Sequence, residues 1–240
     1  MRAATLFAAV LSGALAFASF TGAACAQDYA AILAAPDRTD ADKQNDGKRQ
    51  AAQFLPFIGA RTGMKVLDLG AGAGYSSELM ARSVGESGKV YAQNASKSEK
   101  LEARMQTPAM RNAVALARPY EDPAPAEAGA FDMVTFFFAY HDTIHMGVDR
   151  ARMNKAIFAA LKPGGYLVIA DHSALPEDGV NVSKTLHRIG ESALRAEVEA
   201  AGFKLVGSGD FLRHPEDQRT AAVFRNPTPV DEFVLKFQKP

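Results

Sequence analysis

A tyrosine, two histidines and an aspartate lie within residues 140–145, shortly after the apolar segment 131–137. A histidine titrates near neutral pH and is therefore suited to take a proton from a substrate oxygen or nitrogen. We expect His141 to act as this base, with Asp142 or Tyr140 orienting its ring or the substrate. Three polar groups in succession at the end of a strand favour this interpretation over a purely structural histidine.

The same segment approximates a known zinc-binding spacing. His141-Asp142-x-x-His145 differs from H-E-x-x-H by its acid. That motif requires both histidines on one face of a helix, whereas here a strand directly precedes it. Zinc binding is therefore an alternative for this segment, and we expect no metal.

Residues 66–74 read Val-Leu-Asp-Leu-Gly-Ala-Gly-Ala-Gly and form the most informative motif of the chain. A short apolar run is followed by three glycines at alternate positions and then by a helix-compatible stretch. This order predicts a buried parallel strand, a tight loop and a helix whose N-terminus is open to a ligand. Gly70, Gly72 and Gly74 let the backbone approach that ligand closely. The Asp68 carboxylate is placed to reach a ligand amine or to hold the loop amides.

The glycine spacing distinguishes between two kinds of loop. A dinucleotide-binding G-x-G-x-x-G would need glycine at position 75, which is Tyr75. The motif instead resembles motif I of the class I S-adenosylmethionine-dependent methyltransferases. Residues 161–167, Leu-Lys-Pro-Gly-Gly-Tyr-Leu, resemble the turn before the fifth strand of that family. In that turn we expect Gly164 to cap the preceding helix.

The resemblance implies an α/β fold with a Rossmann-like, doubly wound, seven-stranded sheet, strand order 3-2-1-4-5-7-6 and an antiparallel last strand. Ligands are then expected at the carboxyl ends of the strands. The expected strands are 65–69, 89–93, 113–116, 131–137, 166–170, 203–206 and 232–237. The expected helices are 28–35, 47–58, 75–84, 96–106, 149–161 and 192–201. Between the first two helices, residues 38–46 are expected to form a charged surface stretch.

The resemblance also implies S-adenosyl-L-methionine as the cofactor. The implied cofactor-binding residues are Asp68, Gly70, Ala71, Gly72, Gly74, Asn94, Glu121 and Asp122. The family usually has an acid at the end of strand two that binds the ribose hydroxyls, where this chain has Asn94, an amide that still donates and accepts. After strand three, Glu121 or Asp122 would accept from the adenine amine, or both belong to a solvated turn.

Asp171 and His172 follow the strand expected at 166–170. Together with Asp142, Asp171 resembles the paired carboxylates of the cation-dependent O-methyltransferases. The residue after the second acid is usually an amide in that family, and a hard, oxygen-ligated cation does not favour the imidazole of His172. The simpler expectation is that Asp171 and His172 line the acceptor pocket without a metal.

The sequence therefore predicts S-adenosylmethionine-dependent methyl transfer to an oxygen or nitrogen atom of a small molecule. The alternative is an exported, non-catalytic protein that binds a small molecule or nucleoside on the same fold. The polar loop 175–185 and the long connection 207–231 would cover the acceptor. Arg188 or Arg213 would clamp an anionic substrate there, or both are ordinary surface charges, which is the interpretation we favour.

The first 26 residues are typical of a cleaved export signal. Arg2 precedes an apolar, Ala-rich run at 6–20, and Ala-Cys-Ala at 24–26 fits a cleavage site. The alternatives are a membrane anchor, for which the run is short of the roughly 20 residues needed, and a lipoprotein signal at Cys25. Cleavage would leave 27–240 as a single periplasmic domain without cysteine or stable membrane insertion. The 27 basic and 27 acidic residues form no basic stripe, so nucleic acid is not an expected partner.

Overall fold

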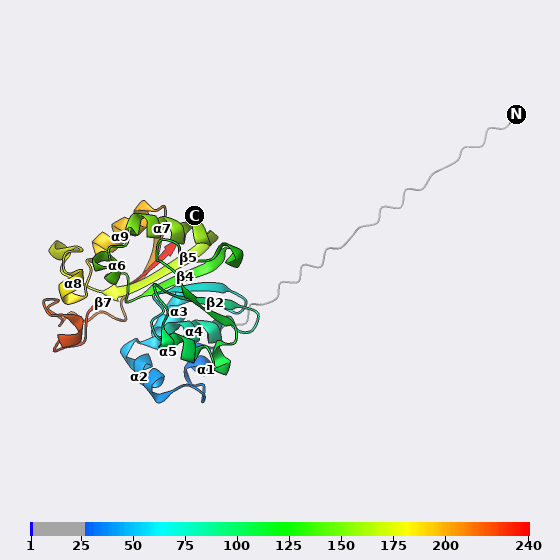
Figure 1. The fold of residues 1–240 in the computed structure, drawn as a ribbon, viewed down its shortest axis with the longest axis horizontal. Coiled ribbons are helices and arrows are strands. Elements are labelled where there is room, and N and C mark those ends of the chain that lie inside the picture. The colour runs from blue at the N-terminus through cyan, green and yellow to red at the C-terminus, as the bar shows by residue number, and fades with distance from the viewer. Residues whose placement is uncertain (2–26) are drawn as a thin grey trace.

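Seven strands form one sheet in the order β3-β2-β1-β4-β5-β7-β6, and β7 runs antiparallel to both of its neighbours. This confirms the expected topology. The computed structural model describes Met1 and residues 27–240 (Figure 1). The expected export signal lies outside the described residues, Met1 apart, and stays a prediction. No helix within residues 27–240 has the length and apolar character needed to cross a membrane.

The strands and helices alternate along most of the chain. The strands are β1 (Lys65–Leu69), β2 (Lys89–Asn94), β3 (Ala113–Ala117), β4 (Phe131–Phe137), β5 (Leu161–His172), β6 (Lys204–Gly209) and β7 (Glu232–Gln238). The helices are α1 (Tyr29–Leu33), α2 (Asp40–Lys48), α3 (Ala51–Ile58), α4 (Tyr75–Val84), α5 (Glu99–Arg104), α6 (Asp142–His145), α7 (Arg150–Ala160), α8 (Ser183–Leu186) and α9 (Glu191–Ala200).

Helices cover both faces of the sheet, with α7 and α9 on one face and α1, α3 and α4 on the other (Figure 1). Because both faces are covered, the central strands β1 and β4 carry apolar residues on both faces of the sheet. In β1, Leu67 packs with the α7–α9 layer, whereas its neighbour Val66 packs with the α3–α4 layer. The core thus consists of two apolar layers, one on each face of the sheet.

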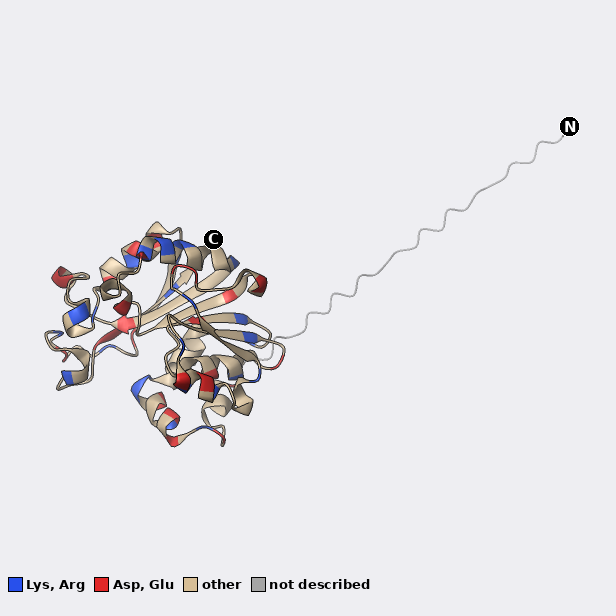
Figure 2. Cartoon of the chain, viewed as in Figure 1, with Lys and Arg blue, Asp and Glu red and all other residues tan. Residues whose placement is uncertain are grey.

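The charged stretch 38–46 lies largely at the surface, as expected, but it is helical and two of its charged residues, Arg38 and Asp42, are buried. The segment forms α2, which begins after Thr39, whose hydroxyl accepts a hydrogen bond from the backbone N–H of Asp42. Asp42 is buried and accepts from Arg104 at 2.9 and 3.0 Å. Its charge is therefore paired with a helix on the far side of the glycine loop and not solvated. Figure 2 shows that α2 carries both acidic and basic residues.

The expected role of Gly164 was wrong. Helix α7 ends at Ala160, and Leu161 already has extended backbone angles and begins β5, paired with Phe131. Gly164 lies in a tight turn further on, with φ +77°, where its N–H donates to the Lys239 carbonyl. Its positive φ therefore serves the turn within β5 and not the helix end.

The long connection between β6 and β7 is held by a buried ion pair. The Arg188 side chain is fully buried, and its guanidinium donates to Asp217 at 2.8 Å and to the carbonyl oxygens of Ser173 and Ala221 at 3.0 Å each. Neither expected role for Arg188, substrate clamp or surface charge, was right. Arg213 is half-buried and pairs with Glu191 and Asp231.

We expect Arg188→Met to lower the free energy of unfolding by about 3–5 kcal/mol, because it leaves the Asp217 carboxylate buried without its partner. The matched control is Arg195→Met, which removes a half-exposed guanidinium 3.0 Å from Glu199 on α9. This control should cost no more than about 0.5 kcal/mol. Urea unfolding followed by circular dichroism measures both values, and equal losses would contradict this account.

Candidate functional site

The three glycines of the loop between β1 and α4 all have left-handed backbone angles. A Cβ on Gly70 would lie 2.8 Å from the Cβ of Ala139, so the loop passes the end of β4 too closely for any side chain. At Gly72, by contrast, nothing lies within 4 Å of such a Cβ. Gly72 therefore faces open space, where a ligand can approach the backbone.

Asp68 supports this loop through its contacts with α4 and β4. Its carboxylate is fully buried and accepts hydrogen bonds from the hydroxyls of Ser76, Ser77 and Thr135 at 2.6–2.8 Å. Burial raises the pKa of Asp68, and these hydrogen bonds oppose the rise. The expectation that Asp68 holds loop amides was wrong: it holds the first turn of α4 and the middle of β4 next to β1.

Two amide side chains at the end of β2 hold the loop from the other side. Asn94 accepts from the Gly72 N–H at 2.8 Å and donates to the Gly72 carbonyl at 3.0 Å. Gln93 accepts from the Gly70 N–H at 3.2 Å, and its backbone carbonyl accepts from Ala71 at 2.9 Å. Asn94 thus fixes the loop conformation, a role that its position in the sequence did not reveal.

Glu121 and Asp122 follow β3, as expected, and both have protein partners. Glu121 accepts from the backbone N–H of Asp149 at 3.1 Å, just before α7. Asp122 forms an ion pair with Arg118 on the same turn. Contact of either carboxylate with an adenine amine stays a prediction.

A cavity of about 330 Å³, which we call the inner cavity, lies between the glycine loop, α3 and the end of β4. Its wall includes Gly70, Ala73, Tyr75, Phe54 and Phe138. Loop backbone forms one side and apolar side chains the other, so the cavity offers both hydrogen-bonding and apolar contact. This combination fits the methionyl half of the implied cofactor.

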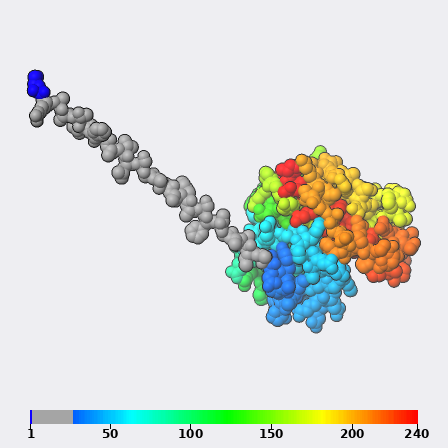
Figure 3. All heavy atoms as spheres, turned by 180° about the vertical axis from the view of Figure 1, so that it is seen from behind, coloured from blue at the N-terminus to red at the C-terminus, as the bar shows by residue number. Residues whose placement is uncertain are grey.

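A larger cavity of about 780 Å³, the outer cavity, lies between α2–α3 and residues 223–232. These two parts of the chain, cyan and orange in Figure 3, meet on the face shown there. Its wall includes Lys48, His172, Phe224 and Glu232. Of the two residues expected to line a pocket here, His172 does so, whereas Asp171 is fully buried and lines neither cavity.

Arg49 and Asn45 line both cavities and so form the boundary between them. The Arg49 guanidinium lies 3.5 Å from the centroid of the Phe138 ring and 3.3 Å from the Glu232 carboxylate. Phe138 has φ +57°, a rare angle for a non-glycine residue, at the point where β4 ends. Arg49 and Phe138 were missed because nothing in their local sequence marks them.

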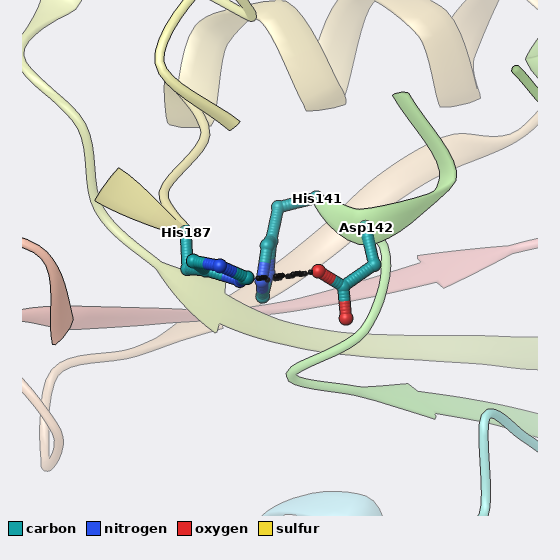
Figure 4. A group of neighbouring side chains, drawn as sticks. All are labelled: His141, Asp142 and His187. Carbon is teal, nitrogen blue, oxygen red and sulfur yellow. Dashed lines mark ion pairs between the residues drawn. The ribbon is translucent and has the colours of Figure 1, made fainter. Parts of the chain in front are cut away.

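His141 lies at the ends of β4 and β5 between two carboxylates. Its Nδ1 is 2.7 Å from Asp171 Oδ1, its backbone N–H donates to the other Asp171 oxygen at 2.8 Å, and its Nε2 is 3.1 Å from Asp142 Oδ1 (Figure 4). Burial alone would lower the pKa of His141, but the charge of Asp171 and the contact with Asp142 raise it to about 10. At neutral pH the ring is therefore an imidazolium, which corrects the expectation of a histidine ready to accept a proton.

Three further histidines surround this group. His187 Nδ1 and His145 Nε2 lie 3.3 and 3.7 Å from Asp142 Oδ1. His172 Nδ1 lies 2.8 Å from the Glu232 carboxylate. His187 was not expected here, because it comes from the end of α8, more than 40 residues beyond Asp142.

Tyr140 points away from this group. Its side chain is fully buried, and its hydroxyl donates to Glu197 at 2.8 Å and accepts from Asn154 at 2.7 Å. These contacts join the end of β4 to α7 and α9. The structure thus gives Tyr140 a supporting role and shows no contact through which it would orient the His141 ring.

The strand order and the glycine loop at the end of β1 define a class I methyltransferase-type domain. A model of the methyltransferase domain family matches residues 60–206, and the chain belongs to this family. S-adenosyl-L-methionine is the cofactor that this membership indicates, and the inner cavity beside the glycine loop fits its methionyl half.

The relatives identified by sequence include two bacterial methyltransferases. The demethylmenaquinone methyltransferase of Lactococcus lactis is 33% identical over 138 residues, which are 56% of this chain and 52% of that protein. A ubiquinone/menaquinone biosynthesis C-methyltransferase of Cronobacter sakazakii is 28% identical over 179 residues, 70% of this chain and 66% of that protein. The matches thus span about half of the first relative and just under two thirds of the second.

Two solved structures share the fold. A SAM-dependent methyltransferase from Aquifex aeolicus has a TM-score of 0.57 and 20% identity, covering 79% of this chain and 89% of its own. The [4+2]-cyclase SpnF has a TM-score of 0.62 and 16% identity, covering 85% of each chain. The fold is therefore found with more than one activity, so the site must carry the functional argument.

We expect the His141 ring to remain protonated at about pH 8, where an ordinary histidine, with a pKa near 6.5, is neutral. The protonated form is favoured in the folded protein, so its contribution to stability is complete below about pH 6.5 and is lost progressively as the pH rises from there to about 10. Nitrogen-15 NMR of EDTA-treated protein measures this midpoint. Asp171→Asn should lower the midpoint, because it removes the largest charge contribution, and a wild-type midpoint near 6.5 would contradict the assignment.

Proposed function

We propose that this protein transfers a methyl group from S-adenosylmethionine to a small molecule held in the outer cavity. The observation that carries the proposal is the shared wall of the two cavities at Arg49 and Asn45. A cofactor in the inner cavity and an acceptor in the outer cavity would then meet at the end of β4. Holding two reactants in line accounts for much of the rate of such a transfer.

The inner cavity supplies the groups that bind the cofactor. When bound, S-adenosylmethionine provides an electrophilic methyl group. Gly70, Ala71 and Ala73 of the loop line the inner cavity, and the N-terminus of α4 favours the carboxylate of the cofactor. Arg49 offers a guanidinium for the same carboxylate, held in place by the Phe138 ring.

The pair of His172 and Glu232 is the group that faces the acceptor. Both residues line the outer cavity, with 2.8 Å between the His172 Nδ1 and the Glu232 carboxylate. We assign the removal of the acceptor proton to this pair and not to His141. His141 is buried between Asp142 and Asp171, and in the metal-free protein these carboxylates raise its pKa above that of an ordinary histidine.

A hydroxylated aromatic ring is the acceptor class that this cavity supports best. Phe224, which is 67% exposed, and His172 offer ring faces to it, and Lys48 offers a cation to an ionised hydroxyl. Transfer to the hydroxyl oxygen follows the expectation from the sequence. Transfer to a ring carbon is the second candidate, because two of the sequence relatives are named as quinone-pathway methyltransferases, one of them a C-methyltransferase.

We expect Gly72→Val to weaken S-adenosylmethionine binding at least about tenfold, or about 1.4 kcal/mol, because its side chain would occupy the open side of the loop. Gly164→Val is the matched control. It also has a positive φ with nothing within 4 Å of the added Cβ, but it lies at the opposite end of β5. The control should lose stability through similar backbone strain and keep wild-type affinity.

Calorimetric titration with S-adenosylmethionine and S-adenosylhomocysteine measures both variants. Equal affinity in the wild type and in Gly72→Val would place the cofactor elsewhere. If the folded wild type binds neither ligand at millimolar concentration, the proposal fails and the non-catalytic alternative takes its place.

A further inference from the structure

We infer that His141, Asp142 and His187 form a binding site for one zinc-like transition-metal ion at the end of β4 (Figure 4). His141 and Asp142 come from the start of α6, and His187 comes from the end of α8. The sequence suggested zinc only through the spacing of His141 and His145. The structure instead brings in His187, which no local motif contains.

The distances suit a single ion. The three ligand atoms, His141 Nε2, Asp142 Oδ1 and His187 Nδ1, all lie within 4.8 Å of one another. Asp142 Oδ1 is 3.1 Å from the first nitrogen and 3.3 Å from the second. Ligands about 2.0–2.1 Å from a tetrahedral zinc ion lie about 3.3 Å apart. Small side-chain adjustments therefore complete the site.

The ligand types select the class of metal. Two imidazole nitrogens and one carboxylate suit zinc and its first-row neighbours, whereas calcium and magnesium prefer all-oxygen surroundings. With three protein ligands, one position stays available for a water or a substrate oxygen, as in catalytic zinc sites. His145 Nε2, 3.7 Å from Asp142 Oδ1, lies at the edge of the site.

Asp171 provides independent support. It is fully buried and contacts His141 Nδ1 at 2.7 Å, which leaves Nε2 as the nitrogen directed at Asp142. A carboxylate behind a ligating histidine is the usual support of protein metal sites, because it fixes the ring and its tautomer. Here the supporting Asp171 belongs to β5, whereas the three ligands lie at the start of α6 and the end of α8.

Asp142 Oδ1 provides a second support. This oxygen is buried and has no hydrogen-bond partner with acceptable geometry among the described residues, although two imidazole nitrogens lie within 3.3 Å. In the metal-free protein the positive charge of His141 lies 3.1 Å from this oxygen without a hydrogen bond of good geometry. A metal ion that displaces the proton from His141 Nε2 would bind this oxygen and both imidazole nitrogens at once.

The site adjoins the outer cavity. The His141 ring lies 5.5 Å from the His172 ring, and the His187 ring lies 5.2 Å from the Phe224 ring, centroid to centroid. His172 and Phe224 both line that cavity. Provided that the proposed methyl transfer is correct, the metal would lie beside the acceptor, where its open position can hold an acceptor oxygen. The existence of the site does not depend on that function.

The test is a zinc titration of EDTA-treated, purified protein, against a chromophoric chelator of known affinity. We expect one zinc ion per chain with a dissociation constant in the micromolar range or below. His187→Ala should weaken binding at least about a hundredfold, and Asp171→Asn about ten- to a hundredfold, through the ring that it supports. His214→Ala is the matched control, because His214 pairs with Glu216 outside this group and should bind zinc like the wild type.

Cobalt replaces zinc in a parallel experiment, because visible absorption bands of tetrahedral intensity report imidazole-containing coordination directly. Absence of stoichiometric zinc binding by the folded wild type would overturn the inference. So would zinc affinity that is equal in the wild type and His187→Ala, with circular dichroism showing that both are folded.

S-adenosylmethionine binding is measured on the same samples to separate the two proposals. Cofactor binding without zinc binding overturns the metal site alone. Zinc binding without cofactor binding supports the metal site and overturns the proposed methyl transfer.

Discussion

The buried carboxylate of Asp68 joins β1, α4 and β4, the three elements beside the inner cavity. It lies near the end of β1 and accepts hydrogen bonds from Ser76 and Ser77 in α4 and from Thr135 in β4. A carboxylate placed in the core is stable only when its oxygens are satisfied in this way. Because these bonds fix α4 and β4 against β1, the loop between them must pass Ala139 so closely that only glycine fits at position 70.

Asp171 has the equivalent role on the other side of β4. From the end of β5 it accepts from the backbone N–H groups of His141 and His172 and contacts the His141 ring. β4 pairs with β1 on one side and β5 on the other, so two buried acids support its exposed end. Asp68 orders the glycine loop, and Asp171 orders His141 and His172 beside the outer cavity. The two halves of the site therefore meet at Phe138, where β4 ends.

The sequence predicted well whatever depends on local pattern. The apolar runs predicted the first and last residues of β1 and β4 correctly. The glycine spacing predicted the loop, and the family resemblance that it carries predicted the strand order. It failed where a residue's state depends on a partner far along the chain. Asp42 looked solvated because Arg104 lies 62 residues away, and the protonation of His141 depends on Asp171, 30 residues further on. His187 and Arg49 carry no local signal at all, and only the folded chain shows what they contact.

The central claim is that the cofactor methyl group lies at the end of β4, where the inner and outer cavities meet. The most direct test is carbon-13-edited NOE spectroscopy of the protein with S-adenosylmethionine labelled at its transferable methyl. We predict cross-peaks from that methyl to the Phe138 ring and to the side chain of Arg49. Cross-peaks from the bound cofactor to other parts of the chain, with none to Phe138 or Arg49, would contradict the account.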